Sequence, residues 1–143
     1  MDASTPPSLL ALTTYLLSRT GKTARARLAT RLGARSRTLR QMAVLAALAD
    51  FGPQVQRELA ERLAIDPSDL VKVLDELAAL GEVERTRSTA DRRRIQVTLT
   101  AAGRAALAEQ TTEAEQVRDE LLAPLSAAER AQLHALLLRV HHG

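Results

Sequence analysis

The stretch that decides the fold runs from residue 66 to residue 100 and reads DPSDLVKVLDELAALGEVERTRSTADRRRIQVTLT. Its first half predicts a helix with clear ends. Asp66 is suited to cap the free amides of the first turn, Pro67 fits the first helical position, and Gly81 fits a left-handed helix end. Apolar residues recur at helical spacing and predict one buried face, made of Leu70, Val73, Leu74, Leu77 and Leu80.

The second half of this stretch predicts a β-hairpin. Ile95, Val97 and Leu99 alternate with polar residues, which is the spacing of a strand with one buried face. A shorter strand over 82–87 precedes it, and the turn between them is basic. A helix fits the major groove of DNA, and an arginine at a hairpin tip can reach a minor groove. The stretch therefore points to DNA as a partner.

The composition is that of a folded, mainly helical protein. Hydrophobic residues make up 45% of the 143 residues and charged residues 26%, which is an ordinary globular balance. Aromatic residues make up only 1%, so leucine, alanine and valine must form the core, and binding of single strands by aromatic stacking is disfavoured. The absence of cysteine excludes disulfides and thiolate metal sites.

The hydropathy pattern indicates neither a membrane span nor a secretion signal. No apolar run approaches the roughly 20 residues that a spanning helix needs. The N-terminus lacks the basic start and apolar run of a signal peptide. We therefore expect a cytoplasmic protein that has no membrane partner.

Charge is distributed unevenly along the chain. The net charge is only +3, yet no acidic residue lies between Asp2 and Asp50, where arginine and lysine recur. The 85–94 segment adds further arginines, whereas the C-terminal part is acidic. Such segregation predicts a basic face for a polyanion and an opposite end kept away from it.

The rest of the chain reads as further helices around the 66–100 stretch. After a flexible lead-in over 1–7, a long helix is expected from Ser8 to about Leu32. Thr38 can cap a second helix over 39–50, and a short third helix is expected from residue 54 or 55 to Ala64. Two short helices joined by a tight turn form a helix-turn-helix.

Two more helices follow the hairpin. Thr100 can cap one that runs from Ala101 to about Leu122. Ser126 and Glu129 form a capping box for the last one, which reaches about Val140. The first helix and the last two carry wide leucine stripes, and the compact helix-turn-helix core has no room to cover them. We therefore expect a two-fold dimer, with its two recognition helices about one DNA turn apart. The expected organisation is a single domain, with 8–33 and 104–141 as dimerisation helices and 36–103 as a winged helix-turn-helix lobe.

The sequence resembles the MarR family of bacterial transcriptional regulators in three places. The segments 56–63 with 66–68 are similar to the family's helix-turn-helix, and 74–85 is similar to its recognition-helix exit. Asp91-Arg92-Arg93 together with 99–103 is similar to its wing. Asp69 and Val71 depart from the pattern, because many members have small polar residues there. We expect Asp69 to cap its own helix and Val71 to touch a thymine methyl.

The resemblance implies a mainly α winged helix-turn-helix that binds a palindromic operator as a homodimer and acts as a repressor. It implies that Asp91 pairs with Arg93 to shape the wing, and that arginine enters the minor groove. It also implies a small-molecule effector held between the lobe and the dimer helices. A helical interaction module whose basic face binds an acidic protein is the alternative function.

The candidate DNA contacts come from both halves of the lobe. Ser68 and Lys72 face outward from the recognition helix as base or phosphate contacts, and the arginines of the turn flank the groove. The alternative for each is that it does not bind DNA and is simply a solvent-exposed charge or part of a capped, exposed helix start. The predicted DNA-binding residues are Ser68, Val71, Lys72, Arg87, Arg92, Arg93, Arg94, Gln54, Gln56, Arg57, Arg37 and Arg40.

No motif for catalysis or cofactor binding stands out. His134 and His141 can share a helix face, but no acid or cysteine completes a metal site. No credible nucleophile and base lie at a useful spacing. We therefore expect no enzyme activity, no metal and no cofactor.

Overall fold

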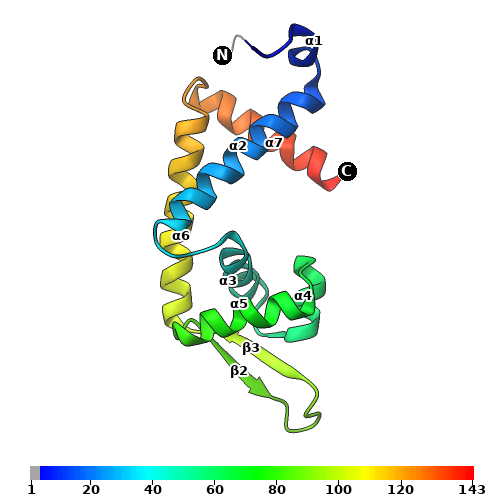
Figure 1. Cartoon of the computed structure of the whole chain (residues 1–143), viewed down its shortest axis with the longest axis vertical. Helices are drawn as coiled ribbons and strands as arrows, with labels where there is room; N and C mark the ends of the chain where they lie inside the picture. Colours follow the sequence, from blue (N-terminus) through cyan, green and yellow to red (C-terminus); the bar gives the residue numbers. More distant parts are fainter. Residues whose placement is uncertain (1–3) are drawn as a thin grey trace. The chain divides into compact units, whose positions relative to one another are not determined.

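The computed structural model describes residues 4–143 as mainly helical with one small antiparallel sheet (Figure 1). Its helices are α1 (Pro7–Leu10), α2 (Thr13–Gly33), α3 (Leu39–Phe51), α4 (Gln56–Leu63), α5 (Pro67–Ala79), α6 (Ala101–Leu121) and α7 (Ala127–His142). Its strands are β1 (Gln54–Val55), β2 (Val83–Arg87) and β3 (Ile95–Leu99). The chain divides into two compact units, which we call the lobe (residues 29–113) and the helical unit (residues 4–28 with 114–143).

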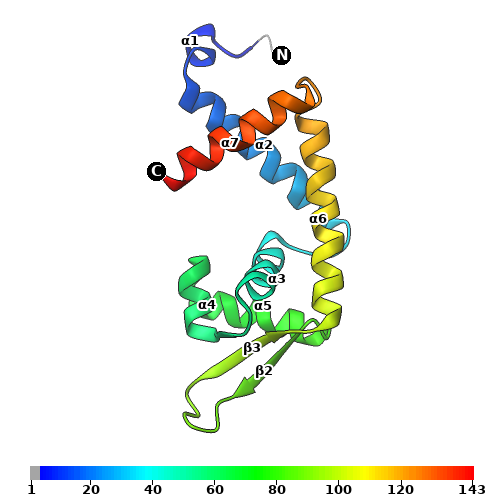
Figure 2. The same cartoon turned by 180° about the vertical axis from the view of Figure 1, so that it is seen from behind.

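The lobe has a core of leucine and valine between its helices and its sheet. The sheet order is β1-β3-β2, and both pairs are antiparallel. The hairpin of β2 and β3 projects beyond the helices in both views of the molecule (Figure 2). The predicted fold class, a mainly α winged helix-turn-helix with a small hairpin, is confirmed. The buried core residues are Val44, Leu45, Ala47, Leu48, Leu59, Ala60, Leu70, Val73, Leu74, Leu77, Val83 and Val97.

The ends of α5 follow the local signals in the sequence. The Asp66 side chain accepts from the Ser68 amide at 2.9 Å and caps the helix, and Pro67 is its first residue. Gly81 has φ of +72°, a conformation that only glycine adopts without strain. The predicted apolar face is buried except at Leu80, which is 55% exposed because the helix has already ended at Ala79. The placement of Leu80 in that face was wrong.

One strand of the sheet was not predicted. Gln54 and Val55 form β1, paired with Val97 and Gln96 of β3, and α4 begins only at Gln56. The expected start of the third helix at residue 54 or 55 was therefore wrong. A two-residue strand has no periodicity of its own, and its partner lies about forty residues further along the chain.

The beginning of α6 is fastened to the exit of α5. The Thr100 side chain caps α6 by accepting from the Gly103 amide at 3.1 Å, and the Thr100 amide donates to the Glu82 carbonyl at 3.1 Å. A Cβ at Gly103 would lie 2.3 Å from that same carbonyl oxygen. Gly103 is therefore required for the close approach of α6 to the segment that leads into β2.

The helical unit has a different character. Within the described residues, Val117 is its buried hydrophobic side chain, and α1 and α7 bury no residue. The expected single helix from Ser8 is wrong. A tight turn, in which the Leu12 amide donates to the Leu9 carbonyl, follows Leu10, and α2 starts only at Thr13. The capping box of Ser126 and Glu129 is present as predicted.

The proposed flexible lead-in falls partly on residues 1–3, which lie outside the described residues. Its last residue, Pro7, is the first residue of α1 and not part of a lead-in. Among residues 4–143, no helix combines the length and apolar character that crossing a membrane requires.

Candidate nucleic-acid interface

The first two turns of α5 present polar and apolar side chains to solvent. Ser68 and Lys72 are exposed, as the helical spacing predicted, and Val71 is exposed as well. The Ser68 hydroxyl donates to Asp66, and this hydrogen bond is the largest cause that holds the pKa of Asp66 below its ordinary value. Because its proton is used in this way, Ser68 offers only lone pairs to a ligand. It is therefore better suited to a base amino group than to a phosphate.

The hairpin turn is organised by two small side chains. The Ser88 hydroxyl accepts from the amides of Ala90 and Asp91, each at 3.2 Å. Asp91 Oδ1 accepts from the backbone amide of Arg93 at 3.0 Å. The expected pairing of Asp91 with Arg93 thus runs through the main chain, which leaves the Arg93 guanidinium available to a ligand.

The arginines of the hairpin have different surroundings. Arg87 donates to the Arg92 carbonyl at 2.8 Å and so braces the turn, and Arg94 lies 3.7 Å from Glu58 of α4. The guanidinium groups of Arg92 and Arg93 make no ion pair or hydrogen bond within residues 4–143, and both residues are exposed. Of the predicted wing contacts, Arg92 and Arg93 are therefore the two that are free for an anionic partner.

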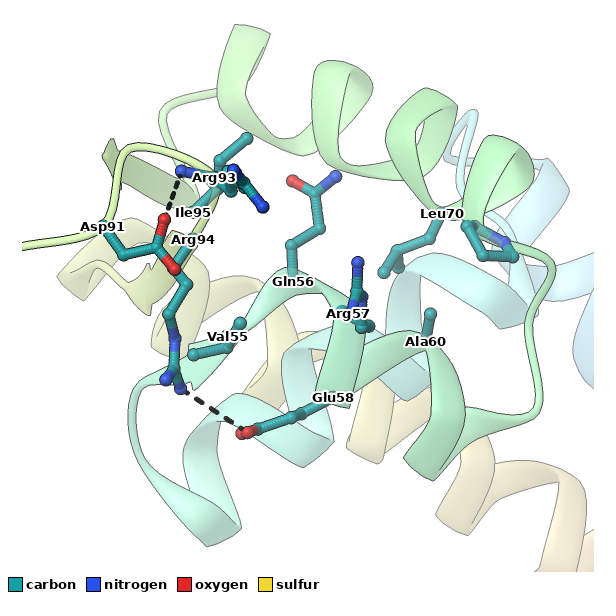
Figure 3. Close-up of a pocket in the computed structure, with 11 residues that line it drawn as sticks. Val55, Gln56, Arg57, Glu58, Ala60, Leu70, Asp91, Arg93, Arg94 and Ile95 are labelled. Carbon is teal, nitrogen blue, oxygen red and sulfur yellow. Dashed lines mark hydrogen bonds and ion pairs between the residues drawn. The ribbon is translucent and has the colours of Figure 1, made fainter. Parts of the chain in front are cut away.

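A groove of about 650 Å³ lies between the turn, the first turn of α4 and the start of α5 (Figure 3). Gln56 projects from α4 toward α5, with Arg93 beside it. Gln56 Oε1 is buried without a hydrogen-bond partner in the described part of the chain. The groove thus brings together Gln56, Arg57, Arg93 and Arg94 from two predicted clusters.

One of the predicted phosphate contacts, Arg37, has structural partners in the lobe. Arg37 forms an ion pair with Glu82, and the two side chains are only 11% and 6% exposed. The buried amide of Gln110, with its oxygen turned toward Arg37, accepts from Nε at 3.1 Å. Arg37 is therefore a buried structural residue, and its assignment to DNA is wrong because its guanidinium is enclosed by these acceptors.

Arg40 and Gln54 lie at the edges of the candidate interface. Arg40 is exposed, and its Nη1 lies 3.5 Å from Asp69 Oδ2. Asp69 therefore faces α3, and the cap of its helix is Asp66, contrary to the expected role of Asp69 as a cap. Gln54 donates to the Pro53 carbonyl at 3.1 Å, a local bond near the start of β1.

An ion pair that the sequence did not predict joins α5 to the hairpin. Arg85 of β2 lies 2.8 Å from Asp75. The pair fixes the first strand of the hairpin against the outer side of α5. No spacing rule links a helix residue to a strand residue ten positions later, so only the opposite charges in the sequence hinted at it.

A second unpredicted cluster lies away from this surface. Glu113 is bonded by Arg31 at 3.1 Å and by Arg35 at 2.9 Å, and these hydrogen bonds, chiefly that from Arg31, lower its pKa. Glu109 lies 3.6 Å from Arg35. The described residues contain no group of three or more His, Cys, Asp or Glu side chains that could hold a metal ion.

Comparisons with known proteins agree with this geometry. A sequence model of the MarR family matches residues 36–94. The HTH-type transcriptional repressor NicR of Pseudomonas putida is 32% identical over 100 residues, and the match covers 70% of this chain and 63% of the length of NicR.

Solved structures extend the likeness over most of the chain. The reduced form of MarR from E. coli is 30% identical, with 90% of this chain and 96% of MarR covered and a TM-score of 0.76. A mutant of MarR complexed with operator DNA has a TM-score of 0.71 at 27% identity, with 96% and 99% covered.

Bordetella bronchiseptica BpsR is similar as well. It is 30% identical, with a TM-score of 0.73 and with 90% of this chain and 97% of BpsR covered. Its structure concerns the regulation of BpsR DNA binding by 6-hydroxynicotinic acid.

Proposed function

Because the chain belongs to the MarR family, we propose that it is a sequence-specific regulator of transcription that binds double-stranded operator DNA in the cytoplasm. One observation carries the proposal: the hairpin turn bears two guanidinium groups, those of Arg92 and Arg93, that have no partner within residues 4–143, and Arg93 lines a groove that the start of α5 also lines. This pairs a basic wing with a helix that fits the major groove. The operator complex of MarR and the repressor NicR support the same reading.

The test is binding to duplexes selected from a random DNA pool, followed by fluorescence anisotropy across a range of salt concentrations. A dimer that makes about 8 phosphate contacts should show a slope of log affinity against log salt near −7. A chain that selects no duplex, but binds an acidic protein in a salt-sensitive way, would establish the alternative function of a protein-interaction module.

We also propose that the chain acts as a homodimer on a palindromic site. The helical unit exposes a row of large apolar side chains that a second copy can cover, and these are Leu12, Leu16, Leu17, Leu136, Leu137, Leu138 and Val140. We expect Leu136→Glu/Leu137→Glu to shift the mass measured by light scattering from dimer to monomer. Ala79→Glu is the control, because Ala79 is an exposed alanine of α5 in the lobe, outside the helical unit, and its substitution should leave the dimer intact. A wild-type chain that is monomeric at micromolar concentration would contradict the proposal.

A small-molecule effector that releases DNA completes the proposal, and repression is the direction that NicR supports. BpsR makes 6-hydroxynicotinic acid the first compound to test. A real effector should raise the melting temperature and weaken DNA binding at the same concentration. If this acid and a panel of phenolic compounds move neither quantity, the effector part of the proposal is wrong.

A further inference from the structure

Two carboxylates lie beside the exposed face of α5, and they have different surroundings. Asp75 is 60% exposed but is held by Arg85 at 2.8 Å, which commits it to the hairpin. Asp69 lies in the first turn, and its Oδ2 lies 3.5 Å from Arg40 Nη1. Neither carboxylate oxygen of Asp69 accepts a hydrogen bond within residues 4–143, and its side chain is 38% exposed.

A carboxylate at this place needs a physical reason. A negative charge near a polyanion is repulsive, unless a cation neutralises it or it accepts a hydrogen bond that repays its desolvation. Arg40 supplies the cation, and its guanidinium keeps further donors exposed to solvent. No group of the described chain donates a hydrogen bond to this carboxylate, so a ligand that displaces water from Asp69 has to supply one.

We propose that Asp69 is a specificity-determining residue, which accepts a hydrogen bond from the N4 amino group of a cytosine in the major groove while Arg40 orients its carboxylate. This inference rests on the proposed function. An ionised carboxylate only accepts, so it matches base edges that donate. In the major groove these are the amino groups of cytosine and adenine.

The groove chemistry favours cytosine over adenine. Adenine places its N7 lone pair next to its amino group, so it is read best by a side-chain amide that both donates and accepts. A carboxylate would place its own lone pairs against the lone pair of adenine N7, which is repulsive. Cytosine offers its amino group without a neighbouring acceptor on the same edge.

Ser68 strengthens this reading. Its hydroxyl donates to Asp66, so the side chain that precedes Asp69 is also an acceptor toward the groove. Lys72, one turn later, is a donor. The start of α5 therefore presents two consecutive acceptors and then a donor, which is a pattern that a base sequence can match.

The experiment selects duplexes from a random pool with the wild-type chain, Asp69→Asn, Asp69→Ala and the control Glu84→Gln. Glu84 is exposed on β2, so its substitution removes the same charge from the lobe without touching α5. We expect the wild type to select cytosine at one position of each half-site. Asp69→Asn should shift that position to adenine, Asp69→Ala should leave it degenerate, and Glu84→Gln should leave it unchanged.

A second arm keeps the wild-type protein and changes the DNA, so it does not depend on the folding of any variant. Removal of the N4 amino group from that one cytosine should weaken binding by roughly 5- to 150-fold, the range for one base contact. If the Asp69 variants that fold select the same base as the wild type, or if the altered operator binds unchanged, Asp69 does not read the sequence. A wild-type chain that selects no duplex at all would instead overturn the proposed function.

Discussion

Two groups of arginines in the lobe show how differently one residue type can be used. Arg31, Arg35 and Arg37 face the carboxylates of Glu113 and Glu82, so their charges are paired within the lobe. Arg92 and Arg93, at the tip of the hairpin, face no carboxylate in the described chain. Both groups form basic clusters in the sequence. Only the acids that the fold brings to them decide which arginines hold the lobe together and which remain for DNA.

The largest expected effect comes from breaking the most enclosed pair. Arg37→Ala leaves the carboxylate of Glu82 buried and unpaired, so it should lower the free energy of unfolding by about 3–5 kcal/mol. Urea denaturation at constant m-value measures this change. Arg92→Ala/Arg93→Ala is the control and should change the free energy of unfolding by less than about 0.5 kcal/mol. Equal stability losses in both variants would abolish the distinction between the two groups.

A second prediction uses the pH dependence of stability to test the arginines that are paired with carboxylates. The hydrogen bonds from Arg31 and Arg35 hold the folded pKa of Glu113 below its ordinary value of 4.5. This carboxylate therefore contributes stability at pH values above 4.5, and the contribution is lost as the pH falls through its folded pKa. Glu113→Gln should flatten the acid limb of a plot of melting temperature against pH.

Glu115→Gln is the matched control for this experiment, because Glu115 lies two residues further along α6 and is exposed. It should keep the acid limb of the wild type. An acid limb of the same steepness in Glu113→Gln and in the wild type would show that the pairing of Glu113 with Arg31 and Arg35 contributes no pH-dependent stability.

The smallest effect is expected where an arginine has an aromatic partner and not a carboxylate. The Arg62 guanidinium lies 4.0 Å from the centre of the Phe51 ring, and Phe51 is 55% exposed. A double-mutant cycle of Arg62→Ala with Phe51→Leu should give a coupling free energy of about 0.5–1 kcal/mol. A coupling of zero would mean that Arg62 belongs with the free arginines.

Local signals in the sequence predicted the framework of the lobe. Asp66, Pro67 and Gly81 mark the ends of α5, and the Thr38 cap is present as expected, as is the Ser126 cap in the helical unit, because each of these interactions lies within a few residues of chain. The strand β3 was predicted as well, because apolar and polar residues alternate around Ile95 and Val97, and this alternation marks the strand face that packs into the lobe.

The errors came from contacts between distant residues. Arg37 is paired with Glu82, 45 residues later, so nothing near Arg37 in the sequence could show that it is buried. The strand β1 exists only through its pairing with β3. The candidate site was therefore predictable as a set of exposed groups around α5 and the hairpin, whereas the division of the arginines was not.

The contribution of the wing to DNA binding is the central claim, and operator affinity at several salt concentrations tests it most directly. A dimer of Arg92→Ala/Arg93→Ala loses four cations, so its log–log salt slope should be less steep by about 3–4 and its affinity near physiological salt at least about tenfold weaker. Arg25→Ala/Arg27→Ala removes equal charge from exposed positions of α2 and should bind nearly as the wild type does. If the wing variant keeps the wild-type affinity and slope, these arginines do not contact DNA.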